Sequence, residues 1–222
     1  MANKLTDNLE ILGDLILTGA IYGSATGLTA ANLASNAAIA RTQLAQNTLQ
    51  RFQVKLTDFR VWDAFQTVLP GTSAADDLGL YGGTFGTNSP QIKTYDVKAA
   101  GAVTLRARAL VHLPIEYDAA ETVLIRLHAG METTVADTTA TIDVECYESN
   151  REGGISADLC TTSATTINSL TLADKDFTIT ATSLNPGDIL DIRITVAVND
   201  AATATAVIAK FGSCELLADV RG

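Results

Sequence analysis

The chain has 222 residues and a formal net charge of −10, because 25 Asp and Glu outweigh 15 Lys and Arg. This length allows one β-sandwich with an appendage and is too short for two large domains. A chain this acidic repels a phosphate backbone, so we expect no nucleic-acid partner. We also expect no membrane contact, since no stretch reaches the roughly 20 apolar residues of a membrane span.

Residues 1–27 are predicted to form short extended segments, because apolar alternation is interrupted by glycines every four to six residues. Such a segment has too few neighbours to bury its apolar side alone. It therefore needs copies of itself or another surface to pack on. The side chains that we expect to make these contacts are Leu9, Ile11, Leu15, Leu17 and Ile21.

Residues 28–50 are rich in Ala, Gln and Asn and contain no Gly or Pro. We predict a short helix here, with Thr29 as its N-cap. Leu33 and Leu44 belong to a narrow apolar seam with a 4-3-4 spacing, and we add both to the predicted oligomer contacts. The alternative is an irregular extended arm, since the leucines also recur about every five residues. Residues 1–50 are thus expected to be an arm for oligomerisation or attachment to another surface, and 51–222 a separate domain.

From Phe52 onward the apolar period becomes two, which is typical of strands with one buried face. The clearest strand is 102–113, and 114–121 has the length of a hairpin connection to the next strand at 123–129. A bend near Thr57 and Asp58 is expected to join two halves of the first strand. The other predicted strands are 52–56, 59–62, 139–147, 165–172, 176–183, 189–198, 203–211 and 214–220.

The spacing of these strands favours an antiparallel β-sandwich that is jelly-roll-like. Asn185 to Asp188 read NPGD, a turn in which Pro186 fixes one backbone angle and Gly187 supplies the next bend. The long, glycine-rich stretch 69–96 is expected to be a surface loop or a contact with a neighbour. The fold class is therefore mainly β, preceded by an extended N-terminal arm with a short helix.

We expect no enzyme, cofactor or metal site, because no catalytic or metal-binding spacing is present. The two histidines, His112 and His128, fall on the polar faces of their strands. Calcium held by loop oxygens around Asp137 or Asn199 and Asp200 is the alternative for metal binding. Asp76 and Asp77, like Glu116 and Asp118, are expected to be solvated loop carboxylates.

The three cysteines, Cys146, Cys160 and Cys214, are an odd number in a chain without an export signal. We interpret them as buried thiols and not as a disulfide framework. Synthesis in a cytoplasm fits this usage.

Three stretches resemble virion proteins of tailed bacteriophages. Residues 12–23 (LGDLILTGAIYG) resemble segments that begin trimeric shafts, and 52–87 with 113–131 are similar to phage proteins predicted to decorate capsids. Residues 183–196 (SLNPGDILDIRITV) are similar to the penultimate strands of jelly-roll modules on phage particles. The resemblance implies a capsid decoration or head-fibre protein on the virion surface, made in the host cytoplasm. Its partners would be the major capsid protein and two further copies in a homotrimer.

Two alternatives to this hypothesis come from other classes. A tail-fibre or receptor-binding module would recognise a host surface glycan through the loop that carries Tyr81 and Phe85. The low aromatic content, 5%, argues against it, because sugar platforms need exposed rings. A glycan-degrading enzyme is the weaker alternative, since no pair of carboxylates can be selected from the sequence.

Overall fold

The computed structural model describes residues 47–97, 101–201 and 205–221, all of them within one compact unit, Gln46–Gly222. The predicted extended segment over 1–27, the helix over 28–46 and all seven arm contacts lie outside the described residues. These contacts are Leu9, Ile11, Leu15, Leu17, Ile21, Leu33 and Leu44. The elements in chain order are β1 (Asn47–Val54), the 3-10 turn η3 (Leu56–Asp58), β2 (Gly79–Tyr81), β3 (Gln91–Lys93), β4 (Gly101–His112), β5 (Val123–Met131), β6 (Thr139–Ser149), β7 (Thr165–Thr166), β8 (Ala173–Ile179), β9 (Ile189–Asp200) and β10 (Ala209–Arg221).

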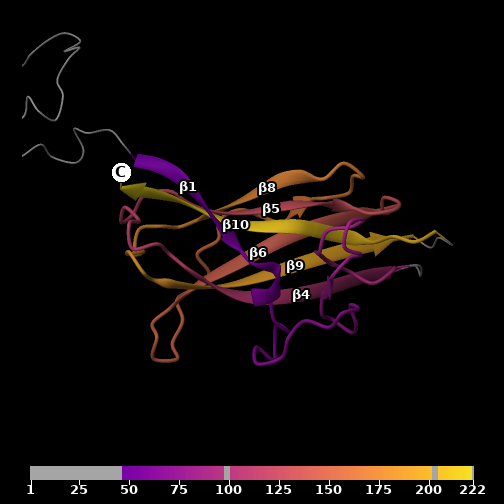
Figure 1. Cartoon of the computed structure of the whole chain (residues 1–222), viewed down its shortest axis with the longest axis horizontal. Helices are drawn as coiled ribbons and strands as arrows, with labels where there is room; N and C mark the ends of the chain where they lie inside the picture. The colour runs from indigo at the N-terminus through magenta and orange to yellow at the C-terminus, as the bar shows by residue number, and fades with distance from the viewer. Residues whose placement is uncertain (1–46, 98–100, 202–204, 222) are drawn as a thin grey trace, which may run out of the picture. The chain divides into compact units, whose positions relative to one another are not determined.

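The described strands form two antiparallel sheets that face each other, which confirms the predicted sandwich (Figure 1). The six-stranded sheet has the order β2-β3-β10-β5-β8, and β1 pairs with the distal part of β10. The four-stranded sheet has the order β4-β9-β6-β7. From β4 onward the long strands alternate between the two sheets, so every long connection crosses the sandwich. This alternation gives the fold its jelly-roll-like character.

The core lies between the sheets and is aliphatic, as the composition predicts. Alternate residues of each long strand point inward, because successive side chains of a strand lie on opposite faces. On β4 the buried series is the predicted one, from Leu105 to Val111, and β9 is buried at every second residue. Phe59 and Phe211 add an edge-to-face ring contact at 5.7 Å between centroids. The core is thus filled from both sheets.

The start of the domain differs from the prediction. Residues 47–50 are the first half of β1, paired with Ala218 to Arg221, and not the end of a helix. The pairing with β10 supplies a partner for each of these residues, which outweighs their helical composition. Residues 59–62 do not continue the strand, because the chain turns at η3 and reaches β4 only through a bridge at Arg60.

The predicted hairpin between 102–113 and 123–129 is wrong. β4 pairs with β9 along its whole length, whereas β5 lies in the other sheet between β10 and β8. The connection crosses to the other sheet, where Tyr117 bridges to Val220 of β10 and Asp118 donates its backbone N–H to the Asp219 carbonyl at 2.9 Å. Tyr117 is fully buried and donates a hydrogen bond from its hydroxyl to the Glu121 carbonyl at 2.7 Å. Burial raises the pKa of Tyr117 to about 12.

Four smaller features can be compared with the predictions from the sequence. The predicted strand 165–172 is reduced to the two residues of β7, while 209–221 is one continuous strand. The stretch 69–96 contains β2 and β3 in addition to loops. The turn at 185–188 is confirmed: the Asp188 N–H donates to the Asn185 carbonyl at 3.2 Å, and Gly187 has a φ of 79°.

Two edges of the sandwich are covered by loops. At the edge of β4, Arg60 and Arg108 exchange backbone hydrogen bonds of 2.8 and 3.1 Å, and Leu78 donates to the Arg106 carbonyl at 2.9 Å. The edge of β8 is covered by residues 159–162. Within 47–97, 101–201 and 205–221, no segment hydrogen-bonds to the outer edge of β1. An uncovered edge strand is a template for pairing with another chain.

Candidate surface sites

The first candidate site is a hollow of about 280 Å³ beside β2 and β3, at the base of the loop that joins them. We call it the Tyr81 hollow. Its lining is mainly polar and includes Tyr81, Asn88, Ser89, Gln91, Lys93 and Lys210. Tyr81 is one of the two residues that the sequence suggested for glycan contact. The structure places it in this surface depression.

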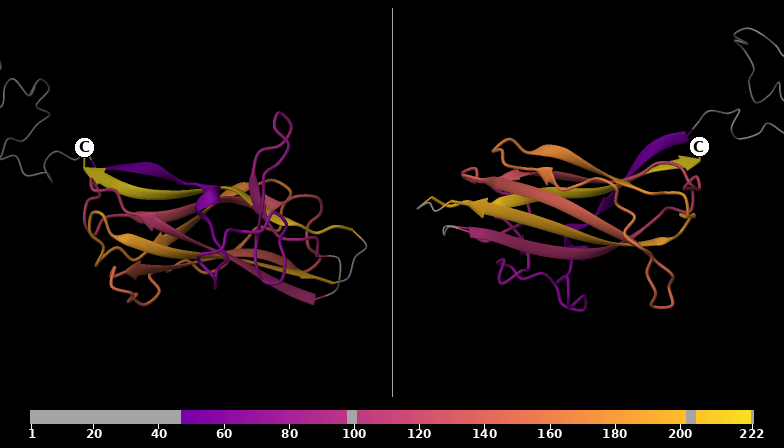
Figure 2. Two further views of the ribbon diagram at one scale, coloured as in Figure 1. Left: turned by 60° about the horizontal axis from the view of Figure 1, so that its bottom comes forward. Right: turned by 180° about the vertical axis from the view of Figure 1, so that it is seen from behind.

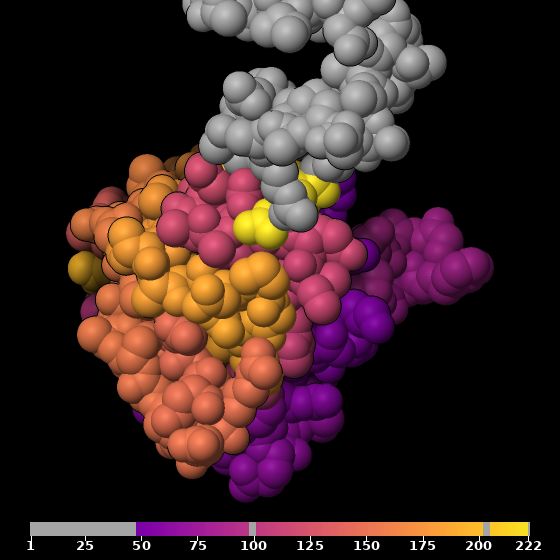
Figure 3. Space-filling view, turned by 90° about the vertical axis from the view of Figure 1, so that its left-hand side faces the viewer, coloured from indigo at the N-terminus to yellow at the C-terminus, as the bar shows by residue number. Residues whose placement is uncertain are grey.

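The loop above this hollow, 82–90, projects from the body of the sandwich (Figure 2, left, and Figure 3). Gly83 lies at a φ of 71°, and a Cβ there would be 2.5 Å from the Asn88 carbonyl oxygen, so only glycine fits. The loop turns at Thr84, whose carbonyl accepts hydrogen bonds of 2.8 Å from two later backbone N–H groups. This turn exposes the Phe85 side chain completely.

The charges in the Tyr81 hollow do not cancel. Lys93 donates to Glu132 at 2.9 Å, and its ammonium lies 4.2 Å from the centroid of the Tyr81 ring. The Lys210 side chain also lines the hollow and makes no ion pair or hydrogen bond within the described part of the chain. Two ammonium groups and one carboxylate leave a net positive charge in a chain whose total charge is −10. An anionic ligand would be attracted here.

The second candidate site is a hollow of about 370 Å³ on the outer face of the four-stranded sheet. We call it the Trp62 hollow. It combines aromatic, aliphatic and charged side chains from three strands and two loops. These are Trp62, Asp63, Arg108, Tyr147, Ile155, Asp191 and Arg193.

The interactions of Trp62 hold the loop after η3 against the sheet. Its indole Nε1 donates to the Asp76 carboxylate at 3.0 Å, and the Arg106 and Arg193 guanidinium carbons lie 5.1 and 5.3 Å from the ring. Arg193 is itself ion-paired with Glu145. Cation–π contacts of this kind contribute about 0.5–2 kcal/mol each. We therefore assign Trp62 a structural role in anchoring this loop.

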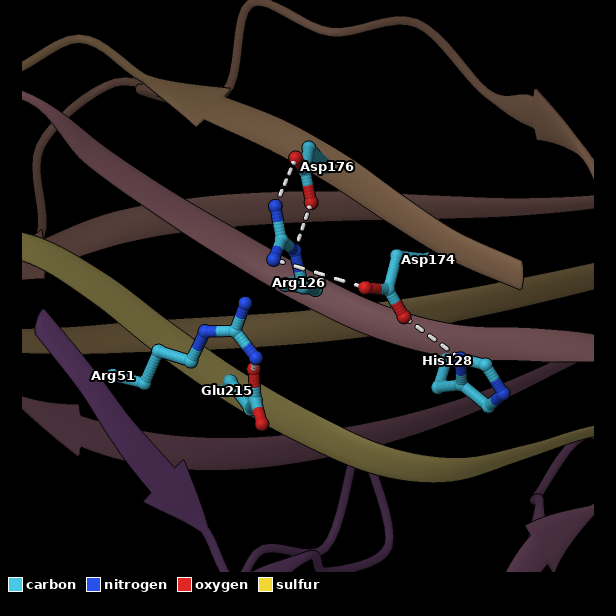
Figure 4. Close-up of polar contacts among 6 residues, drawn as sticks. All are labelled: Arg51, Arg126, His128, Asp174, Asp176 and Glu215. Atoms are coloured by element: carbon cyan, nitrogen blue, oxygen red, sulfur yellow. Dashed lines mark hydrogen bonds and ion pairs between the residues drawn. The ribbon is translucent and has the colours of Figure 1, made fainter. Parts of the chain in front are cut away.

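A row of ion pairs crosses the outer face of the six-stranded sheet (Figure 4). It comprises Arg51, Glu215, Arg126, Asp176, Asp174 and His128, from β1, β10, β5 and β8. Arg126 donates to both Asp176 oxygens at 2.6 and 2.7 Å, which holds the pKa of Asp176 below its ordinary value. His128 lies 2.7 Å from Asp174, directly opposite it in the register. These pairs link adjacent strands.

The histidines and carboxylates considered from the sequence do not converge. His112 and His128 lie on different sheets, on outward faces. Asp200 is buried, and one of its oxygens accepts the Asp137 backbone N–H at 2.9 Å, so it supports this loop. Among the described residues there is no group of three His, Cys, Asp or Glu side chains that could hold a metal ion. In the same part of the chain, no helix is long and apolar enough to span a membrane.

Sequence reasoning missed the Trp62 hollow. The chain contains one tryptophan, which was a signal, but its partners lie on β4, β9 and β6. Only the strand order brings these residues together. Cys146 and Cys214 are buried, as predicted, whereas Cys160 is half-buried.

No family model matches the chain, and no curated protein matches it. Among solved structures, it is similar to the CBM22-1 xylan-binding domain of Paenibacillus barcinonensis Xyn10C, with 10% identity, a TM-score of 0.35, and coverage of 66% of this chain and 82% of that one. A family 30 carbohydrate-binding module of Clostridium thermocellum gives 11% identity, a TM-score of 0.36 and coverage of 76% and 97%. The structure of infectious bursal disease virus, Gx strain, gives 13% identity and a TM-score of 0.37. It matches over 79% of this chain and 32% of that one. At these values, none of the three carries an inference about the function of this chain.

Proposed function

We propose that the protein is a non-catalytic virion structural protein that decorates and stabilises the capsid exterior. Its sandwich would project outward, and its N-terminal residues would bind the major capsid protein and sister copies in a homotrimer. The resemblance of residues 12–23, of 52–87 with 113–131, and of 183–196 to tailed-phage virion proteins supports this proposal.

The observation that carries the proposal is the position of β1. This strand follows directly on residues 1–46 and lies at a sheet edge that nothing else in the described ranges covers. The core between the sheets is filled by residues from Val54 to Ala218. The described residues thus supply a core for the sandwich, and we assign attachment to the first 46 residues.

Attachment would be driven by apolar burial. Leu9, Ile11, Leu15 and Leu17 would each contribute about 1.5–3 kcal/mol when fully buried against a partner. Unpaired backbone groups along β1 would add directional hydrogen bonds. The combination would fasten the sandwich to a shell without any chemical step.

Deleting residues 1–27 and measuring binding to capsid particles tests this proposal. We expect binding to be lost, while the melting temperature of the sandwich stays unchanged. A point variant, Leu17→Asp, should weaken binding more than its neighbour Thr18→Asp, because alternation places them on opposite sides of an extended segment. Undiminished binding of the deletion variant would contradict the proposal.

A second candidate function, recognition of a host glycan, is favoured by the Tyr81 hollow. Tyr81, the amide side chains of Asn88 and Gln91, and the Ser89 hydroxyl offer the mixture of ring and hydrogen-bonding groups that sugars require. The positive charge from Lys210 favours an acidic sugar over a neutral one.

A glycan array with the wild-type chain and a Tyr81→Ala variant tests this second candidate. We expect signals on acidic sugars that disappear in the variant. Ile115→Ala is a control, because Ile115 is exposed and lies near the Val220 end of β10, far from Lys210. An array without signals at high protein concentration would remove this function and leave the capsid proposal intact.

A further inference from the structure

One side of the sandwich is closed by a segment that we call the strap, residues 155–162. It first runs along β6, where Leu159 donates its backbone N–H to the Cys146 carbonyl at 2.7 Å. It then passes to the other sheet, where Thr161 donates to the Thr178 carbonyl of β8 at 2.9 Å. The strap therefore connects the edges of the two sheets.

Two cysteines meet where the strap leaves β6. The Asp158 carboxylate oxygen Oδ1 accepts the backbone N–H of Cys146 and also that of Cys160, each at 2.9 Å. Two bonds to one atom hold the two backbone nitrogens within twice that distance of each other. A disulfide requires a Cα separation of roughly 4.4–6.8 Å, so the backbones are close to this range.

Their side chains also share an environment. Cys146 belongs to the buried core on the inner side of β6, and Cys160 packs against the same core from the strap. Cys214 is different, because it is buried in the six-stranded sheet between Val54 and Leu127. Proximity thus selects one pair among the three thiols.

We propose that Cys146 and Cys160 form a disulfide on exposure to a small-molecule disulfide such as oxidised glutathione, which ties the strap to β6. The Cys160 thiol loses its proton, and the sulfur attacks the glutathione disulfide, releasing one glutathione thiol. The Cys146 sulfur, after losing its own proton, attacks the Cys160 sulfur and releases the second. The protein loses two electrons and two protons, and the glutathione disulfide gains both.

The structure sets the rate of this reaction. Burial raises the pKa of the Cys160 thiol to about 11, and that of Cys146 is also well above its ordinary value for the same reason. Since only the thiolate reacts, oxidation at neutral pH is slow and accelerates about tenfold per pH unit up to the Cys160 pKa. Cys160 reacts first, because it is half-buried whereas Cys146 is inaccessible.

The test is incubation of the full chain with oxidised glutathione at pH 7 and pH 9, followed by thiol counting after unfolding. We expect the count to fall from three to one without attached glutathione, faster at pH 9. A proteolytic digest should contain a peptide that links residues 146 and 160. The melting temperature of the oxidised protein should rise by roughly 5 °C, because the link restricts the unfolded chain.

Three variants distinguish a disulfide between Cys146 and Cys160 from other reactions of the thiols. Cys160→Ser should keep both remaining thiols under oxidation, whereas Cys214→Ala should still lose two. Asp158→Asn keeps the packing and weakens the clamp on both backbone N–H groups, so its oxidation should be slower. Three persistent thiols after long treatment at pH 9, glutathione retained on Cys160, or a link to Cys214 would overturn the proposal.

Discussion

Arg108 on β4 and Asp191 on β9 are joined by a two-point ion pair across the outer face of the four-stranded sheet, with Nε at 2.7 Å from Oδ1. The hydrogen bond to Asp191 also raises the pKa of Arg108 above its ordinary value. Asp191 is one of the few buried charged residues among those described, and the ion pair with Arg108 compensates for its lost hydration. Both residues line the Trp62 hollow.

Asp191→Asn should lower the free energy of unfolding by about 1–3 kcal/mol, because it weakens a charge-assisted, two-point interaction. Urea denaturation measures this change. Glu215→Gln is the matched control: its partner Arg51 lies 4.0 Å away and is largely exposed, so less than about 1 kcal/mol should be lost. Equal losses in both variants would show that burial does not set the strength of these pairs.

Asp176 should stabilise the fold only above acid pH. The pKa of Asp176 is lower in the folded chain than in the unfolded chain, because Arg126 donates two hydrogen bonds to its carboxylate. The stabilisation is therefore complete above the unfolded pKa of about 4 and is lost as the pH falls through the folded value. Asp176→Asn should be less stable than the wild type at pH 7, and the two should be equally stable at a pH below the folded pKa of Asp176. Urea midpoints measured across this range check it, and a pH-independent difference would contradict the assignment.

Asp77 should behave in the opposite way. Desolvation, and then the nearby charges of Asp76 and Asp63, raise its pKa, and its Oδ1 atom is buried without a hydrogen-bond partner. The ionised form is thus penalised in the fold at neutral pH. Asp77→Asn should raise the melting temperature at pH 7, and the gain should shrink as the pH falls toward 4. A variant that is less stable at both pH values would contradict this reading of Asp77.

The loop above the Tyr81 hollow offers two adjacent glycines with different requirements. Gly83→Ala should distort the loop, because its Cβ would meet the Asn88 carbonyl and its φ is positive. We expect a loss of about 1–3 kcal/mol in unfolding free energy. Gly82→Ala should be nearly neutral, since nothing lies within 4 Å of its Cβ. Similar effects in the two variants would mean that the loop does not depend on Gly83.

The strand content of the domain could be predicted from the sequence because each long strand carries its own alternation. The series from Leu105 to Val111 marks a buried face without any knowledge of its partners, and Pro186 and Gly187 mark a turn through their backbone angles. These are local properties. The same holds for the aliphatic core, which follows from composition.

Strand pairing could not be predicted in this way. The hairpin expected between 102–113 and 123–129 is an inter-sheet crossing, because β4 pairs with β9, whereas β5 pairs with β10 and β8. The residues of the Trp62 hollow and the two thiols beside Asp158 come together through strand order alone. Residues 47–50 join a strand because β10 pairs with them, against their helical composition.

We propose that this protein decorates a capsid as a trimer attached through its N-terminal residues. Imaging of the assembled particle tests it most directly. We predict sandwiches that project from the outer surface of the capsid in groups of three, with residues 1–46 against the shell. Sandwiches found on the tail alone, or held to the shell by the four-stranded sheet with the N-terminal residues pointing outward, would contradict it.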